Sequence, residues 1–339
     1  PVDPYGLSEE LKAAKEAEIP VIAYDDLIMN TDALKYYVTF GGRQIGQLIG
    51  QEIIDKEELE KLQEAKESKT IEFFMGSLDD EQALFFYNGL MEKLQPYLDD
   101  GTLVCKSGQI TFEETGILRW SMDEAQSRAE ETLSEFYSDT ETPDIICTGF
   151  DGAAEGVLKA LRNDGLTLGE NWPMITGVGC DADAVRNIAE SEIACSVFMD
   201  RRVLADQAED MVNVYLHGED DPEVNDYEQY DNGTKIIASY LCEPQLINID
   251  NYEILIDNGY YTGDEVKPEA TPTPEPTVTP EITEEPDVTA TPEVTESPEA
   301  TITPEVTEES EETATPTPTE KVTPTPKERV TLKRSTKNK

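Results

Sequence analysis

Residues 145–161, IICTGFDGAAEGVLKAL, place a short apolar run directly before an amphipathic helical pattern. The run 145–148 predicts a buried strand, and the following turn leads into a helix over 152–163. Similar pairs of an apolar run and a helical pattern recur from residue 7 to residue 266. This alternation predicts an α/β fold in which parallel strands are joined by helical crossovers.

The same patterns give the bounds of the expected elements. The expected strands are 21–24, 71–75, 103–106, 145–148, 174–178, 195–198 and 236–240. The expected helices are 7–18, 44–66, 80–98, 122–137, 152–163, 182–189 and 202–216. In 80–98 the apolar side chains recur at three- and four-residue steps, as one buried helix face requires.

The chain is strongly acidic, because its 339 residues include 73 Asp and Glu against 26 Lys and Arg, a net charge of −47. Such a charge repels phosphate backbones, which argues against a nucleic-acid partner. The sequence after residue 266 contains 13 of the 21 prolines and no aromatic residue. We therefore expect 267–326 to be a disordered Thr/Pro/Glu-rich spacer and the basic residues 327–339 to begin a further domain.

Carboxylates follow four of the expected strands. Asp25 follows VIAY, Asp79 and Asp80 follow IEFFMGSL, Asp151 follows IICTGF, and Asp181 follows MITGVGC. Each of them is alternatively a simple helix N-cap. Because the carboxyl ends of parallel strands line the ligand crevice of an open sheet, carboxylates at four strand ends indicate a shared site. With the indole of Trp120, they predict carbohydrate recognition, in which carboxylates accept hydrogen bonds from hydroxyls and an aromatic face covers the ring.

Catalytic and metal chemistry find little support in the sequence. His217 is the only histidine, and no Gly-rich phosphate loop is present. A Ser-His-Asp or Cys-His arrangement would need that same histidine. The five cysteines have no metal-binding spacing and are expected to be buried thiols. We therefore expect a binding protein that is no enzyme and uses no cofactor.

At these residues the sequence resembles a known family, the type I periplasmic solute-binding proteins of sugar ABC importers. The similarity is greatest to the branch that binds xylose and multiple monosaccharides. The segments that carry it span residues 1 to about 263 and include IPVIAYDDLI, YYVTF, FMGSLDDEQALFFYNGLM, GILRW, FDGAAEGVLKAL, GCDADAVRNI and NGYY.

The resemblance implies two α/β lobes that are joined by three hinge crossings and close over a sugar. The first lobe would hold residues 1–40 and 200–241, and the second 41–199 and 242–266. It also implies about two further strand–helix units and a secretion signal ahead of Pro1, so the first lobe is expected to be incomplete here. The expected location is extracytoplasmic, either periplasmic or anchored at the cell surface as a lipoprotein.

The resemblance also assigns ligand-binding positions. The matching residues are Asp25, Asp80, Gln82, Trp120, Asp151 and Asp181. This chain has Asp26 where the family usually has Arg, Met199 where it usually has Lys, and Phe150 where a polar residue or Tyr is usual. Four arginines, Arg43, Arg119, Arg201 and Arg202, are near these positions in sequence only. A pocket that gains a carboxylate and loses two cations should reject sugar acids and favour neutral or cationic ligands.

Two functions remain open at this point. The first is a monomeric binding protein that captures a monosaccharide by hinge closure and delivers it to the permease of an ABC importer. The alternative is a sugar-sensing or cell-wall-associated module without a transport role, for which a sensor kinase is an expected partner. The spacer and the basic segment that follows it favour the alternative, because delivery to an importer does not require them.

Overall fold

The computed structural model describes residues 3–137, 141–169, 171–218 and 221–267, which belong to one compact unit, Pro1–Thr273. The strands are β1 Val21–Tyr24, β2 Leu34–Phe40, β3 Lys69–Phe74, β4 Leu103–Val104, β5 Ile145–Thr148, β6 Met174–Ile175, β7 Cys195–Phe198, β8 Ala238–Cys242 and β9 Gln245–Asn248. The helices are α1 Ser8–Glu16, α2 Gly42–Lys56, α3 Leu59–Ala65, α4 Glu81–Asp100, α5 Phe112–Thr115, α6 Met122–Phe136, α7 Asp151–Asn163, α8 Ala182–Ala189, α9 Arg201–His217, α10 Ile254–Asp257 and α11 Gly263–Val266. A single 3₁₀ turn covers Leu118–Trp120.

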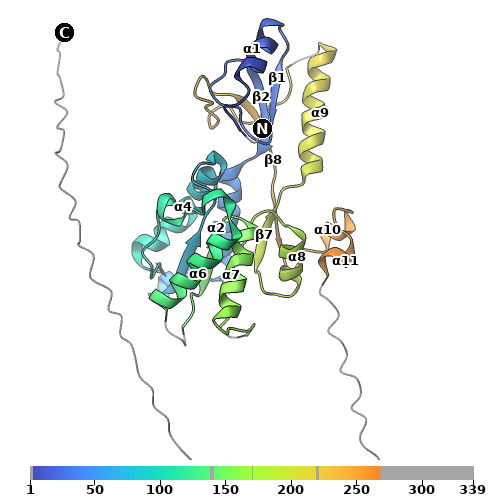
Figure 1. Cartoon of the computed structure of the whole chain (residues 1–339). Coiled ribbons are helices and arrows are strands. Elements are labelled where there is room, and N and C mark those ends of the chain that lie inside the picture. Colours follow the sequence, from blue (N-terminus) through green and yellow to red (C-terminus); the bar gives the residue numbers. More distant parts are fainter. Residues whose placement is uncertain (1–2, 138–140, 170, 219–220, 268–339) are drawn as a thin grey trace, which may run out of the picture. The chain divides into compact units, whose positions relative to one another are not determined.

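The strands form three sheets. The small sheet has the order β1-β2-β8, the large sheet has the order β4-β3-β5-β6, and all pairs in both are parallel. The third sheet pairs β7 with β9 in the antiparallel sense. In Figure 1, α1, β1 and β2 lie together, and α2, α4, α6 and α7 form another group. The predicted α/β fold with parallel strands is confirmed, and β9 is its antiparallel exception.

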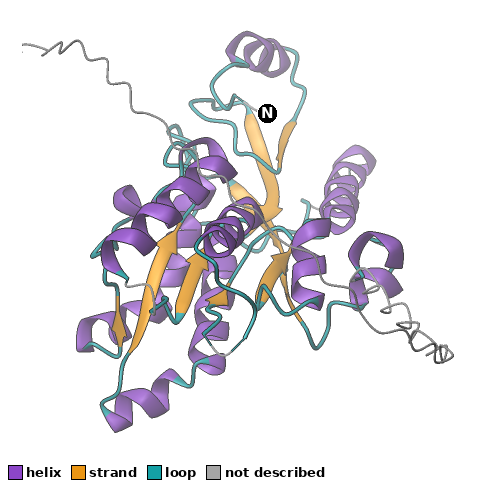
Figure 2. Cartoon of the chain, turned by 60° about the horizontal axis from the view of Figure 1, so that its bottom comes forward, coloured by secondary structure: helices purple, strands orange, loops and turns teal. Residues whose placement is uncertain are grey.

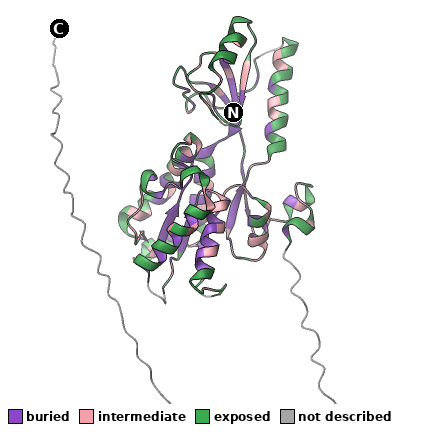
Figure 3. Ribbon diagram, in the orientation of Figure 1, coloured by how far each residue is buried: buried purple, intermediate pink, exposed green. Residues whose placement is uncertain are grey.

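Two hydrophobic cores cover opposite faces of the large sheet. Ile71 and Phe73 of β3 pack with α2 and α4, whereas Phe74 packs with α6 and α7. Successive side chains of a strand point to opposite faces, so this alternation follows from the pleat. Figure 2 shows helices on both sides of this sheet, and Figure 3 shows the buried residues concentrated on its strands.

Glycines let α2 and α4 approach closely. A Cβ atom at Gly46 would lie 2.0 Å from the carbonyl oxygen of Phe86, and one at Gly89 would lie 2.0 Å from that of Arg43. Neither position has room for a side chain. The close packing fixes the direction of α4, whose first residues border the candidate site described below.

The main differences from the expected elements are local. β2 and β9 were not among the expected strands, although YYVTF is part of β2. The expected helix 44–66 is interrupted at Glu58, which adopts a left-handed conformation with φ 51° between α2 and α3. No Gly or Pro marks this break, so the sequence pattern carries no signal for it.

The small sheet draws its strands from residues 21–40 and 238–242. The bounds of the two lobes, 1–40 with 200–241 and 41–199 with 242–266, stay a prediction. The expected spacer and the start of a further domain lie, from residue 268 onward, outside the described residues. No helix among the described residues is both long and apolar enough to cross a membrane.

Candidate functional site

Asp25 lies at the carboxyl end of β1 in a sharply turned backbone with φ 67°. Its amide donates to the carbonyl oxygen of Val38 at 2.9 Å. Its own carbonyl oxygen accepts from the hydroxyl of Tyr37 and, at 3.0 Å, from that of Thr39. Left-handed conformations are rarely adopted by residues with a side chain, so these bonds from β2 hold the turn in place.

Asp25, Asp26 and Asp80 come together from two strand ends. Burial raises the pKa of the Asp25 carboxyl, and the negative charge of Asp26 raises it further. Burial likewise raises the pKa of Asp80, to which Asp26 also contributes. Like charges disfavour each other's ionised form, so the site gains an electrostatic preference for a cation or for hydroxyl donors.

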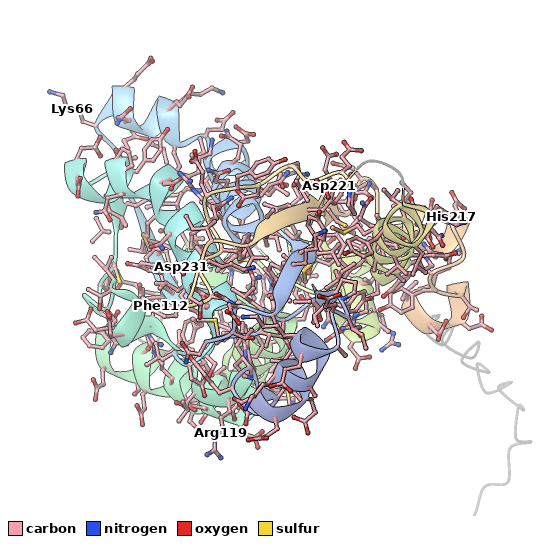
Figure 4. All side chains as sticks on the ribbon, turned by 90° about the horizontal axis from the view of Figure 1, so that it is seen from above. Lys66, Phe112, Arg119, His217, Asp221 and Asp231 are labelled. Carbon is pink, nitrogen blue, oxygen red and sulfur yellow. The ribbon has the colours of Figure 1, made fainter. Side chains whose placement is uncertain are left out.

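Arg201 is a positive charge that partly offsets this cluster. It is the first residue of α9, and its charge partly offsets the rise that burial causes in the pKa values of Asp25 and Tyr24. Sequence position alone placed Arg201 merely near Met199. The fold brings Arg201 close enough to Asp25 to act on its pKa, because α9 packs against β2, the neighbour of β1 in the small sheet. Arg119, by contrast, is exposed, and its side chain extends outward in Figure 4.

Asp80 and Gln82 begin α4. Asp80 is the N-cap of this helix, and its carboxylate accepts from the amide of Gln82 at 2.8 Å. The Gln82 side chain turns toward the small sheet, where its Nε2 donates to the Tyr37 hydroxyl at 2.9 Å. Asp80 therefore serves as a cap and also belongs to the carboxylate cluster.

Trp120 and Phe150 form an aromatic pair. Their ring centroids are 5.2 Å apart and the rings are nearly perpendicular, at 86°. A Cβ atom at Gly76 would lie 2.3 Å from the indole, so the ring rests directly on the backbone at the end of β3. Trp120 remains 37% exposed. The loop between β3 and α4 thus links this aromatic pair to Asp80.

Asp151 is the first residue of α7 and is only 2% exposed. One carboxylate oxygen accepts from the Ser196 hydroxyl and the other from the Asp181 amide, both at 2.7 Å. Burial raises the pKa of this carboxyl to about 7, although both hydrogen bonds favour the ionised form. Asp151 thereby positions the loop over residues 177–181, and its expected direct contact with a ligand stays a prediction.

Asp181 and Met199 complete the expected set. Asp181 occupies the N-cap position of α8 without a side-chain hydrogen bond to that helix, and its side chain is exposed. Met199 is half-buried and packs against the core that contains α2 and α4. Cys180, which precedes Asp181 in the loop, accepts a hydrogen bond at its carbonyl oxygen from the Tyr261 hydroxyl, at 2.8 Å.

The C-terminal segment of the described chain binds to this loop and its neighbours. Besides Tyr261, the ring of Tyr260 packs 4.6 Å from that of Phe198, and Arg186 of α8 donates to the Glu265 carbonyl oxygen at 2.5 Å. Val266 is fully buried in the same core as α8. These contacts were not predictable from the sequence pattern, apart from the matching segment NGYY.

The site residues thus form two groups. The first contains Asp25, Asp26 and Asp80 with Arg201, and the second contains Phe150, Asp151 and Asp181. Trp120 joins them, since it contacts both Phe150 and the backbone before Asp80. Cavities of about 340, 410 and 240 Å³ are lined by other residues. Within the described ranges, no group of three or more His, Cys, Asp and Glu side chains is placed to hold a metal ion.

Residues 1–220 match the family model of the periplasmic binding protein domain. The chain belongs to this family. It is 40% identical over 268 residues to the multiple sugar-binding periplasmic receptor ChvE of Rhizobium radiobacter, covering 78% of this chain and 74% of that protein. The D-xylose-binding periplasmic protein of Escherichia coli is 25% identical over 261 residues, covering 77% and 72%. The resemblance to periplasmic sugar-binding proteins is confirmed.

Solved structures of this family are also similar. A solute-binding protein of an ABC transporter from Clostridium phytofermentans, with bound β-D-glucose, shares 40% identity with a TM-score of 0.71, covering 78% of this chain and 80% of that one. A carbohydrate transporter solute-binding protein from Chloroflexus aurantiacus, in complex with D-glucose, shares 25% identity with a TM-score of 0.64, covering 78% and 79%. These relatives are receptors and binding proteins, as expected for a periplasmic binding protein that is no enzyme.

Proposed function

We propose that this periplasmic binding protein captures a neutral monosaccharide between its two lobes and delivers it to an ABC importer. The observation that carries the proposal is the gathering of Asp25, Asp26 and Asp80 beside Arg201. Carboxylates and a guanidinium offer acceptors and donors to the hydroxyls of a sugar, and bidentate pairs add directionality. The names and bound glucose of the relatives support the same ligand class.

The aromatic pair supplies the other half of the site. Trp120 is partly exposed beside Phe150, so its indole can cover the apolar face of a sugar ring. Asp181, at the start of α8, offers a carboxylate that α8 does not use as a cap. Contacts from both lobes exist only when the lobes close, so binding shifts the population toward the closed state.

The ligand specificity follows from the charge of the site. Three carboxylates with one nearby arginine favour neutral sugars and amino sugars over sugar acids. D-Glucose and D-xylose are the first candidates, because the relatives are named for or contain these sugars. Isothermal titration calorimetry of the full-length protein against D-glucose, D-xylose, D-glucosamine and D-glucuronate tests this order. Preferred binding of D-glucuronate would contradict it.

Two substitutions test the assigned residues. Trp120→Ala and Asp181→Ala should each weaken sugar binding by about tenfold or more, the effect of losing roughly 1.4 kcal/mol of contact energy. Asp183→Ala, two positions further on α8, where Asp183 pairs with Arg186 at the surface, is the matched control and should bind as the unmodified protein does. Unchanged affinity in Trp120→Ala and Asp181→Ala would remove both residues from the site.

The alternative, a sensory or wall-associated sugar-binding module, is favoured by the Thr/Pro/Glu-rich sequence that follows residue 267. The two roles differ in the partner. Delivery predicts that the sugar-loaded protein stimulates the ATPase of a reconstituted importer, and that the genes for an ATPase and a permease lie nearby. A neighbouring sensor kinase and no stimulation of ATP hydrolysis would favour the alternative. An extracytoplasmic location is part of both proposals.

A further inference from the structure

The first turn of α4 makes polar contact with the small sheet. Gln82 donates from Nε2 to the hydroxyl of Tyr37 at 2.9 Å. The Tyr37 hydroxyl in turn donates to the carbonyl oxygen of Asp25. The Tyr37 hydroxyl therefore donates one hydrogen bond, to the carbonyl oxygen of Asp25, and accepts another from Nε2 of Gln82. This chain of hydrogen bonds runs from α4, through β2, to the turn that carries a predicted ligand contact.

The same turn of α4 also makes apolar contact with the small sheet. Phe85, one helical turn after Gln82, places its ring 5.2 Å from that of Tyr230. Tyr230 packs edge-on against Tyr37 at 5.0 Å, and both tyrosines are fully buried. Phe85 thus packs against the core of the small sheet. Aromatic pairs of this geometry contribute beyond the area they bury.

These contacts lie beside a hinge crossing. β2 continues through Gly41 directly into α2, so the chain leaves the small sheet at this point. A Cβ atom at Gly42 would lie 2.7 Å from Oε1 of Gln82 and 3.1 Å from Cβ of Phe85. The crossing therefore passes against the two α4 residues that reach the small sheet, so these contacts lie where the chain passes from the small sheet to α2.

Asp26 and Asp80 form a repulsive pair between the small sheet and α4. Asp26 follows β1 of the small sheet, and Asp80 caps α4 of the other group. Burial raises the pKa of Asp80 and the negative charge of Asp26 raises it further, so the two carboxylates repel each other. An attractive contact between the same two parts of the molecule can offset this repulsion in the ligand-free protein.

We propose that Gln82 and Phe85 form a latch with Tyr37 and Tyr230, and that this latch sets the fraction of the ligand-free protein that is closed. The proposal rests on the two-lobed sugar-binding function above. In it, Gln82 is a positioning residue that acts through Tyr37 rather than a direct contact of the sugar. The latch favours closure and the Asp26–Asp80 pair opposes it, so the two together tune the affinity.

Distances between nitroxide labels test the latch in the full-length protein. The exposed Glu10 of α1 and Lys61 of α3 are replaced by labelled cysteines, in a Cys105→Ala background because Cys105 is the one native cysteine that is not fully buried. Tyr37→Phe, Gln82→Leu and Phe85→Ala should each shift the ligand-free distance distribution toward the open state. Losing one hydrogen bond should raise the ratio of open to closed molecules by about fivefold.

Matched controls separate the latch from general destabilisation. Tyr87→Phe removes a hydroxyl of α4 that donates to the Ile110 carbonyl oxygen at 2.9 Å and does not reach the small sheet. Leu84→Ala truncates an exposed neighbour of Phe85. Neither control should shift the distances. The double variant of Tyr37→Phe and Gln82→Leu should shift the distances by less than the sum of the two single shifts, because both substitutions remove the hydrogen bond between Gln82 and Tyr37.

The outcomes distinguish the latch from the proposed function. Distance distributions of Tyr37→Phe and Gln82→Leu that match the unmodified protein would overturn the latch, even if Phe85→Ala fails to fold. A shift of similar size in the controls would also overturn it. If the unmodified protein binds no sugar, the proposed function fails, whereas the ligand-free distances still decide on the latch. If sugar binds, the latch variants should bind it about fivefold more weakly, through faster dissociation.

Discussion

Replacement of Asp151 by Asn should abolish a large part of the pH dependence of folding stability. In the folded protein burial raises the pKa of Asp151 to about 7 from an ordinary value of 3.8. Between these pH values the folded protein keeps a proton that the unfolded chain releases. The contribution of the protonated carboxyl is thus fully present below about pH 4 and is lost as the pH rises toward 7.

The expected magnitude follows from the size of the shift. At about 1.4 kcal/mol per pKa unit, a difference of roughly three units corresponds to about 4 kcal/mol. No discount for solvent screening applies, because the carboxyl is buried. Asn preserves the shape, since its oxygen can accept from the Asp181 amide and its nitrogen can donate to Ser196. The variant should therefore gain stability relative to the unmodified protein as the pH rises from 4 to 8.

Urea unfolding followed by tryptophan fluorescence, at intervals between pH 4.5 and 8, measures this difference. The two curves of unfolding free energy against pH should diverge toward high pH. Ser196→Ala serves as a second probe, because loss of its hydrogen bond should raise the pKa of Asp151 and move the divergence to higher pH. Parallel curves for Asp151→Asn and the unmodified protein would refute the argument.

Two further predictions concern packing and charge. Gly46→Ala should lower the free energy of unfolding by about 3 kcal/mol, because its Cβ would collide with the Phe86 backbone. Gly169→Ala is the control: its Cβ would meet no atom closer than 3.8 Å, so urea unfolding should be unchanged. Arg201→Ala should raise the pKa of Asp25 further, because Arg201 lowers it. Carboxyl chemical shifts followed through an NMR titration would report the change, and an unmoved midpoint would place Arg201 away from the cluster.

Much of the fold was predictable because several buried strands are short apolar runs. β1, β5 and β7 have the predicted bounds. β2 is also almost fully buried, but Lys, Thr and two Tyr interrupt its apolar character, so composition alone did not mark it. The break at Glu58 arises from a left-handed residue that carries no glycine or proline signal.

The candidate site was predictable in its location but less so in its roles. Strand ends place Asp25, Asp80 and Asp181 by topology alone. The burial and hydrogen bonding of Asp151 depend on Ser196, Gly177 and Gly179, which come from other parts of the chain. Likewise, Gln82 and Arg201 act on partners more than 40 and 170 residues away in sequence. Such long-range partners are determined by tertiary packing, which no local pattern encodes.

The final residues of the described chain have a practical meaning for anyone who shortens this protein. Tyr260, Tyr261 and Val266 fasten the last turns onto α8 and the loop that carries Asp181. A stop codon placed ahead of Tyr260 would remove the residues that pack behind the candidate site at Asp181 and would expose apolar side chains of that core to water. Tags and reporter fusions should therefore be placed after residue 267, where they leave the contacts of residues 260–266 intact.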